Sequence, residues 1–373
     1  MGNSFDVAIA GGGIVGAACA EECAASGLKV VVVEPGPVGG GATAAGMGHI
    51  VVMDDSPAQI ALTNYSRSLW MARAQEFPGD VEYVAAGTLW VAADEEEMAE
   101  VRRKLDVYHS IGVRASVLDA RDIAKEEPNL RPGLAGGLLV PDDAVVYPPC
   151  AARYQLERAR QNGAVLRIGE SAASLSGAGI KLRDGTLLSA GITVNATGAW
   201  APELTPGIEV RKRKGHLVIT ERYPGWVRHQ LVELGYLKSA HSTTEDSVAF
   251  NVQPRKTGQL LIGSSRQFGA EHREIDHHML VRMLARAQEY MPGLAQLSAI
   301  RSWTGFRAAT PDKLPLIGPC PGDERLYVAT GHEGLGITTS MATGKLVAAL
   351  ILGQTPAIPA ALYLPGRKQE AHA

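Results

Sequence analysis

The stretch DVAIAGGGIVGAACAEECAASGLKVVVVE, residues 6–34, limits the possible folds of this chain more than any other stretch. A short apolar run leads into Gly11, Gly13 and Gly16, an Ala-rich helical pattern follows, and a second apolar run ends at Glu34. In the spacing G-x-G-x-x-G, the glycines permit a tight turn, a close approach of a pyrophosphate and tight helix packing. The segment therefore predicts a βαβ unit that binds a dinucleotide, with Glu34 accepting hydrogen bonds from a ribose.

Two glycine-rich segments bear on which dinucleotide this is. An acid at Glu34 disfavours NADP but leaves NAD and FAD open. The loop PGPVGGGATAAGMGHI (residues 35–50) follows directly, where an NAD dehydrogenase usually continues into a helix. A later turn, ATGHEGLGITTS (residues 329–340), precedes a helix whose N-terminal dipole suits the negative charge of a reduced flavin. Both signals favour FAD, although the later turn has the alternative role of simply packing a strand on a helix.

The pattern of the remaining chain predicts two interleaved domains. With 373 residues, 46% hydrophobic and 20% charged residues, the chain is long enough for two cores. Rossmann-type signals recur at 5–34, 144–200 and 325–353, whereas 87–140 and 208–305 resemble an antiparallel sheet with helices beside it. We expect an α/β fold in which a Rossmann-type FAD-binding domain (1–86, 143–207 and 305–373) is interrupted by an α+β substrate domain (87–142 and 208–304).

Charge, cysteines and hydropathy narrow the partners and the location. A net charge of −3 gives no field that would attract nucleic acid. Cys19 and Cys23 lie four apart on one helix and are expected to pack in the core, and no cysteine or histidine pattern predicts a metal site. We expect no membrane span. We expect a cytoplasmic protein, with a peripheral position at the inner face of the membrane as the alternative.

Three stretches together resemble a known family. They are IAGGGIVGAACAEECAASGLKVVVVE, TVNATGAW, and GFRAATPDKLPLIG followed by LYVATGHEGLGITTSMATGK. In this order they are similar to the D-amino-acid oxidase, glycine oxidase and sarcosine oxidase superfamily of FAD-dependent oxidoreductases. HEGLGIT and AAGMGHIVVMDDSPAQ most resemble its bacterial amino-acid and imino-acid dehydrogenases, which include D-hydroxyproline dehydrogenase, the opine oxidase β subunits and the hydrogen cyanide synthase flavin subunit.

The resemblance implies an activity and a fold of the GR2 type. The family oxidises a C–N bond by hydride transfer from the substrate α-carbon to flavin N5, and the imine then hydrolyses. We expect a small amino or imino acid substrate, with a D-hydroxyproline or D-proline-like compound favoured. The alternatives are a flavin subunit of a heteromeric opine- or glycine-oxidising complex, a sarcosine or glycine oxidase that uses oxygen, and, least favoured, an NAD-linked dehydrogenase. The electron acceptor stays open between a partner subunit, a quinone and oxygen, as does a homo- or hetero-oligomeric state.

The resemblance also assigns residues. Sarcosine oxidases attach their flavin through a cysteine just before the TPD-like stretch, and TGFRAATPD has none, so non-covalent FAD is expected. Arg307 matches the position that binds the substrate carboxylate, with an ion pair to Asp312 as the alternative. Further candidate contacts to substrate or flavin are His49, Lys214, His216, Tyr236 and His241. For the basic run 211–214 as a whole, the alternative is a solvated strand edge.

The predicted FAD-binding residues occupy the glycine-rich turns and strand ends. They are Gly11, Gly13, Ile14, Val15, Gly16, Glu34, Pro35, Gly41, Ala42, Thr43, Gly46, Met47, Gly48, Ala196, Thr197, Gly198, Gly305, Arg307, Gly331, His332, Glu333, Gly334, Leu335, Gly336, Ile337 and Thr338.

Overall fold

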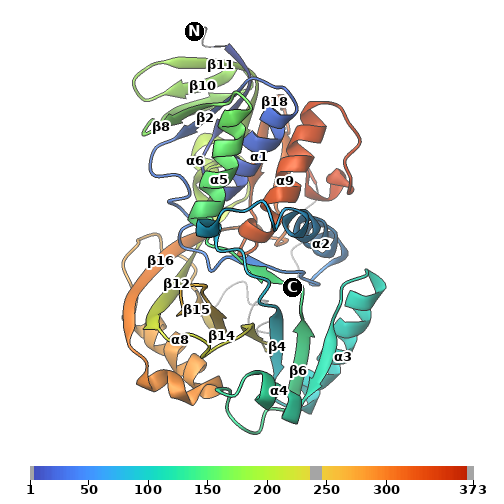
Figure 1. Cartoon of the computed structure of the whole chain (residues 1–373). Helices are drawn as coiled ribbons and strands as arrows, with labels where there is room; N and C mark the ends of the chain where they lie inside the picture. Colours follow the sequence, from blue (N-terminus) through green and yellow to red (C-terminus); the bar gives the residue numbers. More distant parts are fainter. Residues whose placement is uncertain (1–3, 236–245, 368–373) are drawn as a thin grey trace.

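Two eight-stranded sheets, one above the other in Figure 1, organise the chain. The computed structural model describes residues 4–235 and 246–367. Strands of both sheets alternate along the chain, so each sheet is assembled from segments far apart in sequence. Tyr236 and His241, two of the predicted substrate contacts, lie outside the described residues.

The first sheet is a mostly parallel, Rossmann-type sheet. β1 and β2 are buried along most of their length, which explains their nearly continuous apolar sequence. The central path has the order β17-β18-β11-β1-β2-β8, and β17, β9 and β10 pair antiparallel to their neighbours. The strands are β1 (Ser4–Ala10), β2 (Val30–Glu34), β8 (Val165–Ile168), β9 (Ala172–Ser176), β10 (Gly179–Leu182), β11 (Leu187–Asn195), β17 (Leu316–Cys320) and β18 (Asp323–Thr330).

Four helices lie together beside the first sheet (Figure 1). At Gly344 a Cβ would come within 2.6 Å of the Ala18 carbonyl oxygen, so two of these helices approach closely only because that residue is glycine. Cys19 and Cys23 are fully buried in this core, as expected for packing residues. The helices are α1 (Ile14–Ala25), α2 (Pro57–Ala72), α5 (Pro148–Gln161) and α9 (Gly336–Ile351).

The second sheet has the order β16-β12-β15-β14-β13-β4-β6-β5. Its pairs are antiparallel except for β4 and β13, which run parallel. The sequence predicted an antiparallel sheet and gave no sign of this parallel pair, because the pairing of two distant strands leaves no local pattern. Its strands are β4 (Thr88–Ala92), β5 (Ser116–Asp119), β6 (Gly136–Val140), β12 (Arg211–Arg222), β13 (Gln230–Glu233), β14 (Ser247–Pro254), β15 (Gln259–Arg266) and β16 (Ala299–Ala309).

Shorter elements complete the chain. α8 packs on β14 and β15 through residues such as Met283 and Tyr290, the latter stacked on Phe250. The remaining elements are α3 (Glu95–Ser110), α4 (Ala120–Glu126), α6 (Ala201–Leu204), α8 (His277–Tyr290), the two-stranded pair β3 (His49–Ile50) and β7 (Ala144–Val145), and the 3-10 helices η1 (Gly79–Val81), η2 (Gly198–Trp200), η3 (Pro292–Gln296) and η4 (Ala360–Tyr363).

The α/β class and the two kinds of sheet agree with the sequence prediction. The domain limits stay a prediction, since strand pairing assigns strands to sheets and not residues to folding units; β16, for example, crosses the expected limit at 304/305. Within the part of the chain described here, no helix combines the length and the apolar character needed to cross a bilayer.

Candidate active site

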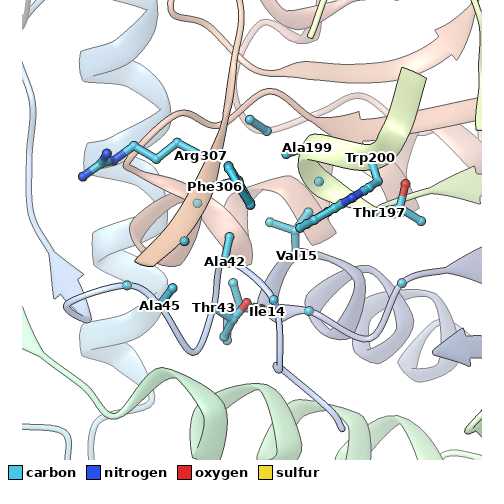
Figure 2. A pocket seen from close by; sticks show the side chains of 18 of the residues that line it. Ile14, Val15, Ala42, Thr43, Ala45, Thr197, Ala199, Trp200, Phe306 and Arg307 are labelled. Carbon is cyan, nitrogen blue, oxygen red and sulfur yellow. Dashed lines mark hydrogen bonds between the residues drawn. The ribbon is translucent and has the colours of Figure 1, made fainter. Parts of the chain in front are cut away.

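A cavity of about 680 Å³ lies where the strand-to-helix turns of the first sheet face β12 and β16 of the second. Ligands of doubly wound sheets bind at this carboxyl end of the strands. Figure 2 shows Arg307 at one side of the cavity and Trp200 with Thr197 at the other, with Ala42 and Thr43 between them. Its wall includes residues from the three glycine-rich segments at 11–16, 35–50 and 329–340. A wall drawn from all three segments fits an extended dinucleotide better than a compact ligand.

The turn after β1 has the close backbone approach and the exposed helix N-terminus that are typical of a phosphate-binding turn. Gly11 has φ +107°, and a Cβ there would lie 2.5 Å from the Ala196 carbonyl oxygen, so only glycine fits. α1 starts with no side-chain cap from Gly13, while the Ile14 N–H donates to Thr43 Oγ1 at 3.0 Å. The helix N-terminus therefore offers backbone donors and a positive dipole end.

Glu34 is fixed at the end of β2 by two backbone donors. Its Oε2 accepts from the Gly12 N–H at 2.7 Å and its Oε1 from the Gly36 N–H at 2.9 Å. Each carboxylate oxygen has further acceptor capacity. This geometry suits the ribose role predicted from the sequence.

The turn before α9 carries a neutral histidine. α9 has no side-chain cap at Leu335, and His332 Nε2 lies 3.0 Å from Thr343 Oγ1. Because Thr343 donates its own hydrogen to the Thr339 carbonyl oxygen at 2.9 Å, the proton of the imidazole must sit on Nε2. Burial lowers the pKa of His332 to about 3, so a neutral ring stands beside an uncapped helix end.

Most of the predicted FAD-binding residues meet in this cavity. Those in its wall are Gly11, Gly13, Ile14, Val15, Glu34, Pro35, Gly41, Ala42, Thr43, Gly46, Met47, Gly48, Ala196, Thr197, Gly198, Gly305, Arg307, His332, Glu333, Gly334, Gly336 and Ile337, joined by the predicted substrate contact His49.

Four predicted residues lie outside the wall of the large cavity, for identifiable reasons. A Cβ on Gly16 would overlap the Gly11 carbonyl oxygen, so this glycine serves helix packing. Gly331 has φ +78° and serves the turn. Thr338 Oγ1 donates to the His49 carbonyl oxygen at 2.7 Å and supports the loop from behind. Leu335 lines a neighbouring pocket instead.

Several other wall residues were not predicted from the sequence, because strand pairings and side-chain contacts between distant segments bring them to the cavity. Ser171, Ala172 and Arg183 reach the cavity through the β9–β10 hairpin. Trp200 contacts Phe306 edge-on, with ring centroids 6.0 Å apart. The TGAW motif was the available signal for Trp200, while the hairpin residues left none.

A smaller pocket of about 90 Å³ adjoins the cavity and shares His49, Asn251, Arg307, Glu333 and Gly334 with it. Its remaining lining has seven polar or charged residues and five apolar ones: Asp55, Gln59, Thr88, Arg213, Gln230, Arg266 and Lys313, with Val51, Met53, Trp90, Val232 and Leu335. Lys313 and Glu333 have positive φ values, 60° and 52°, which non-glycine residues rarely adopt. Such strain gathers at functional sites.

Arg307 stands at the junction of the two spaces. Its Nη1 donates to the Ser265 carbonyl oxygen at 2.9 Å, and its guanidinium lies against Gly215 of β12. The alternative partner Asp312 pairs with Arg367 instead, at 2.8 Å. This pairing gives no support to the alternative reading, an ion pair between Arg307 and Asp312.

The basic run 211–214 is neither a solvated edge nor a uniform lining. Arg213 is buried, lines the smaller pocket and pairs with Glu333. Lys214 is fully buried, and its Nζ donates to the Glu274 carbonyl oxygen; desolvation lowers its pKa. Lys214 lies in neither wall, so the prediction that it lines the flavin site has no support from its position.

His216 and His49 both face the large cavity. His216 Nε2 accepts from the Asp276 N–H at 3.0 Å, so its Nδ1 carries the proton and donates to Ser265 Oγ at 2.8 Å. Burial lowers the pKa of both histidines to about 4. With His332, the cavity therefore holds three histidines that stay neutral near pH 7.

The described residues contain no group of three or more His, Cys, Asp or Glu that could hold a metal ion. All four cysteines are buried, and none lines either space.

Comparison with known proteins identifies the family to which this chain belongs. The family model described as "DAO: FAD dependent oxidoreductase" matches residues 6–350. The chain belongs to the DAO family of FAD-dependent oxidoreductases. FAD is thus the cofactor, and the uncapped helix ends, the fixed Glu34 and the close glycine turns fit it.

Individual relatives match along almost the whole chain. Glycine oxidase of Geobacillus kaustophilus is 29% identical over 367 residues, covering 94% of each chain. The crystal structure titled glycine oxidase from that organism has a TM-score of 0.87 at 28% identity and covers 98% of this chain and 99% of its own. Hydrogen cyanide synthase subunit HcnC of Pseudomonas aeruginosa is 27% identical, covering 99% of this chain and 97% of the relative. L-proline dehydrogenase from P. horikoshii shares the fold, with a TM-score of 0.87 at 24% identity and 98% coverage of both chains.

Proposed function

We propose that this DAO-family member oxidises the C–N bond of a small amino or imino acid, with a D-hydroxyproline or D-proline-like compound as the favoured substrate. The observation that carries the proposal is the position of Arg307 in the walls of both the FAD cavity and the smaller pocket. Relatives named glycine oxidase, and a protein of the same fold named L-proline dehydrogenase, support the substrate class.

Arg307 has the chemistry to fix the substrate. A guanidinium binds a carboxylate through two parallel hydrogen bonds, which sets both its position and its orientation. Arg307 Nη1 donates to the Ser265 carbonyl oxygen at 2.9 Å, which ties the guanidinium to β15. Because Arg307 lines both spaces, we expect a carboxylate bound there to hold the substrate at their junction.

The chain's other residues hold the cofactor and keep the site in one charge state. We expect Glu34 to bind the adenosine ribose, the start of α1 to bind the pyrophosphate, and the start of α9 to face the flavin ring. FAD, when bound, supplies the two-electron oxidant for the C–N bond. The neutral His49, His216 and His332 add no positive charge that would compete with Arg307 for the carboxylate. Water hydrolyses the imine after its release.

Substitution of Arg307 tests this function. Arg307→Ala is expected to lower kcat/KM for amino acids by roughly a hundredfold or more, since a charged, oriented contact is lost. The amount of bound FAD is expected to stay unchanged, as measured by absorbance. Arg121→Ala, at a side chain 95% exposed, is the matched control. Near-normal kinetics in Arg307→Ala would contradict the proposed role.

A second candidate is a flavin subunit of a heteromeric complex. The similarity to HcnC over 99% of this chain favours it. The purified chain, supplied with amino acids and an artificial dye acceptor, decides between the two: rapid turnover alone supports the independent enzyme. Peroxide formation in the same assay would identify oxygen as the acceptor and indicate a glycine- or sarcosine-oxidase type of activity.

We also propose that FAD is held without a covalent bond, because the four cysteines lie away from both spaces. Acid precipitation is expected to release the flavin into the supernatant. Yellow colour that stays with the denatured chain would contradict this.

A further inference from the structure

The large cavity and the smaller pocket share a junction that carries two opposite charges. Of the described residues that line both spaces, Arg307 is basic, Glu333 is acidic, and the others are uncharged: His49, Asn251 and Gly334. An α-amino or imino acid carries a carboxylate and a basic nitrogen on the same carbon. A cation and an anion at one junction therefore match both groups of such a ligand.

The backbone of Glu333 is held to the strand that carries Arg307. The Glu333 N–H donates to the carbonyl oxygen of Ala308, the next residue of β16, at 2.9 Å. A Cβ on Gly334 would lie 3.6 Å from Arg307 Nε, so the turn packs directly against the arginine side chain. The positive φ of Glu333 persists because these contacts hold the turn in place. The acid and the substrate anchor are thus fixed relative to each other.

One oxygen of the Glu333 carboxylate is paired and the other is not. Its Oε1 pairs with Arg213 of β12. Its Oε2 is buried and has no hydrogen-bond partner among the described residues, and the side chain is only 12% exposed. An ionised carboxylate can only accept hydrogen bonds, and buried polar atoms are nearly always paired. Oε2 is therefore suited to an N–H group of a ligand.

The other charges of the smaller pocket make the position of this acid informative. Four basic residues line the pocket beside two acids: Arg213, Arg266, Arg307 and Lys313, with Asp55 and Glu333. The pocket as a whole favours an anionic group, so a basic nitrogen needs an acid close to it. Asp55 is exposed and lines the smaller pocket only. Of the two acids, Glu333 is the one that also reaches the cavity that holds FAD.

The oxidation itself creates a positive charge on the substrate nitrogen. The substrate reacts as the free amine. Its α-carbon C–H bond breaks, the hydride leaves with both electrons of that bond, and the nitrogen lone pair forms the C=N bond. The N–H stays on nitrogen, which changes from neutral to cationic, and FAD is the oxidant that the family's reaction supplies. A fixed anion beside this nitrogen stabilises the charge that develops in the transition state.

We propose that Glu333 is a catalytic residue: its Oε2 accepts a hydrogen bond from the substrate amine and stabilises the positive charge that develops on the nitrogen. The inference rests on the proposed function, because it takes Arg307 as the carboxylate anchor. It adds the group that binds the nitrogen, a role different from the FAD contact that the sequence predicted for Glu333.

A binding measurement on the FAD-loaded protein tests this contact without turnover. 2-Methylproline and 1-methylcyclopentanecarboxylate differ only in an N–H in place of a CH₂, and neither has an α-hydrogen to transfer. 2-Aminoisobutyrate and pivalate form the matching acyclic pair. Their Kd values can be read from the change in the flavin spectrum. We expect an amine to bind the wild type at least about tenfold more tightly than its carbon analogue, and Glu333→Gln to abolish this preference.

Rapid kinetics and matched variants separate catalysis from a structural role. The rate at which amino or imino acids reduce the flavin without oxygen is expected to fall about a hundredfold in Glu333→Gln. The FAD content and urea stability of the same sample show whether the fold is intact. Glu324→Gln, at an exposed residue that lines neither space, is the matched control. Arg213→Gln breaks the same ion pair but keeps the carboxylate, so it should retain the amine preference.

Three results would overturn the inference and leave the proposed function standing. The first is an amine preference that survives in Glu333→Gln. The second is an equal loss of the preference in Arg213→Gln, which would mean that the acid acts only through its ion pair. The third is a larger loss in Asn251→Leu or His49→Leu, which remove buried neutral groups of the same junction. If no amino or imino acid is oxidised, the proposed function fails, and the inference fails with it.

Discussion

Arg307 of β16 and Gly215 of β12 lie against each other, with the guanidinium where a side chain at position 215 would begin. A Cβ on Gly215 would overlap Nη1 and come within 2.9 Å of Cζ and Nη2. The absent side chain of one strand therefore makes the space for the functional side chain of its neighbour.

Gly215→Ala should accordingly impair substrate binding. Gly215 has no positive φ, so alanine fits the backbone and the arginine must move. We expect KM to rise roughly tenfold, since displacement of a positioning group by about 1 Å can cost that much or more. Steady-state kinetics measure this, with FAD content checked by absorbance. Gly79→Ala, where no atom lies within 4 Å of an added Cβ, is the control, and equal KM values in the two variants would count against the prediction.

Glu34 should determine FAD affinity rather than turnover. Its carboxylate is held by the N–H groups of Gly12 and Gly36, and we expect it to bind the ribose. Glu34→Ala is expected to raise the Kd for FAD by roughly ten- to a hundredfold, because hydrogen bonds to a charged group contribute about 1.5–3 kcal/mol. Titration of the apoprotein by fluorescence measures the Kd. At saturating FAD, kcat should return to nearly the wild-type value; a permanently low kcat would show another role.

Lys104 should stabilise the fold around Trp90. Lys104 and Asp54 form an ion pair with side chains 0% and 1% exposed, and Lys104→Met would leave the acid with Arg103 at 2.6 Å. We expect the free energy of unfolding to fall by about 3 kcal/mol, measured by urea denaturation. Asp54→Asn in the same chain should restore much of the loss. The exposed Lys256→Met is the control; a loss as large there would refute a specific role for the buried pair.

The three cavity histidines predict how stability depends on pH. Burial lowers the pKa of His49 and His216 to about 4 and of His332 to about 3. Below about pH 6.5 the unfolded chain takes up protons that the folded chain refuses, so acidification from pH 6.5 to about 4 destabilises the fold. Each histidine contributes up to about 1.4 kcal/mol per pH unit.

One buried acid opposes this trend. Burial raises the pKa of Asp143 to about 7, so between about pH 7 and 4 the folded state binds a proton that the unfolded state does not, and acidification stabilises it. Because three histidines act against one aspartate, the free energy of unfolding still falls on acidification. Urea titrations at pH 6.5, 5.5 and 4.5 measure the slope. His332→Gln should reduce it by about 1.4 kcal/mol per pH unit; an unchanged slope would contradict the neutral state assigned to His332.

The sequence alone predicted those parts of the site whose residues belong to one continuous segment of the chain. Gly11 and the turn at His332 each follow a strand and precede a helix, and Glu34 ends the second strand, so the local pattern predicts their place at the carboxyl end of the sheet. Arg307 was identifiable because the motif GFRAATPD resembles one with a known role. In all these cases the informative residues lie within one continuous segment of the chain.

The smaller pocket could not be predicted in the same way. Gln230 and Thr88 are 142 positions apart and meet only because β13 and β4 pair in parallel. Arg213 lies opposite Arg307 through the register of β12 and β16, and Glu333 reaches Arg213 from the turn before α9. None of these pairings has a local pattern, because strand register is decided by the assembled sheet.

The interleaved order of the two sheets has a consequence for when the cofactor site forms during folding. The cavity wall begins at Ala10 and is completed by Gly336 and Ile337 at the start of α9. Ala10 and Ile337 are 327 positions apart. The complete cavity wall therefore exists only when the chain has folded through the start of α9. We expect tight binding of FAD to require a chain that is complete through this helix.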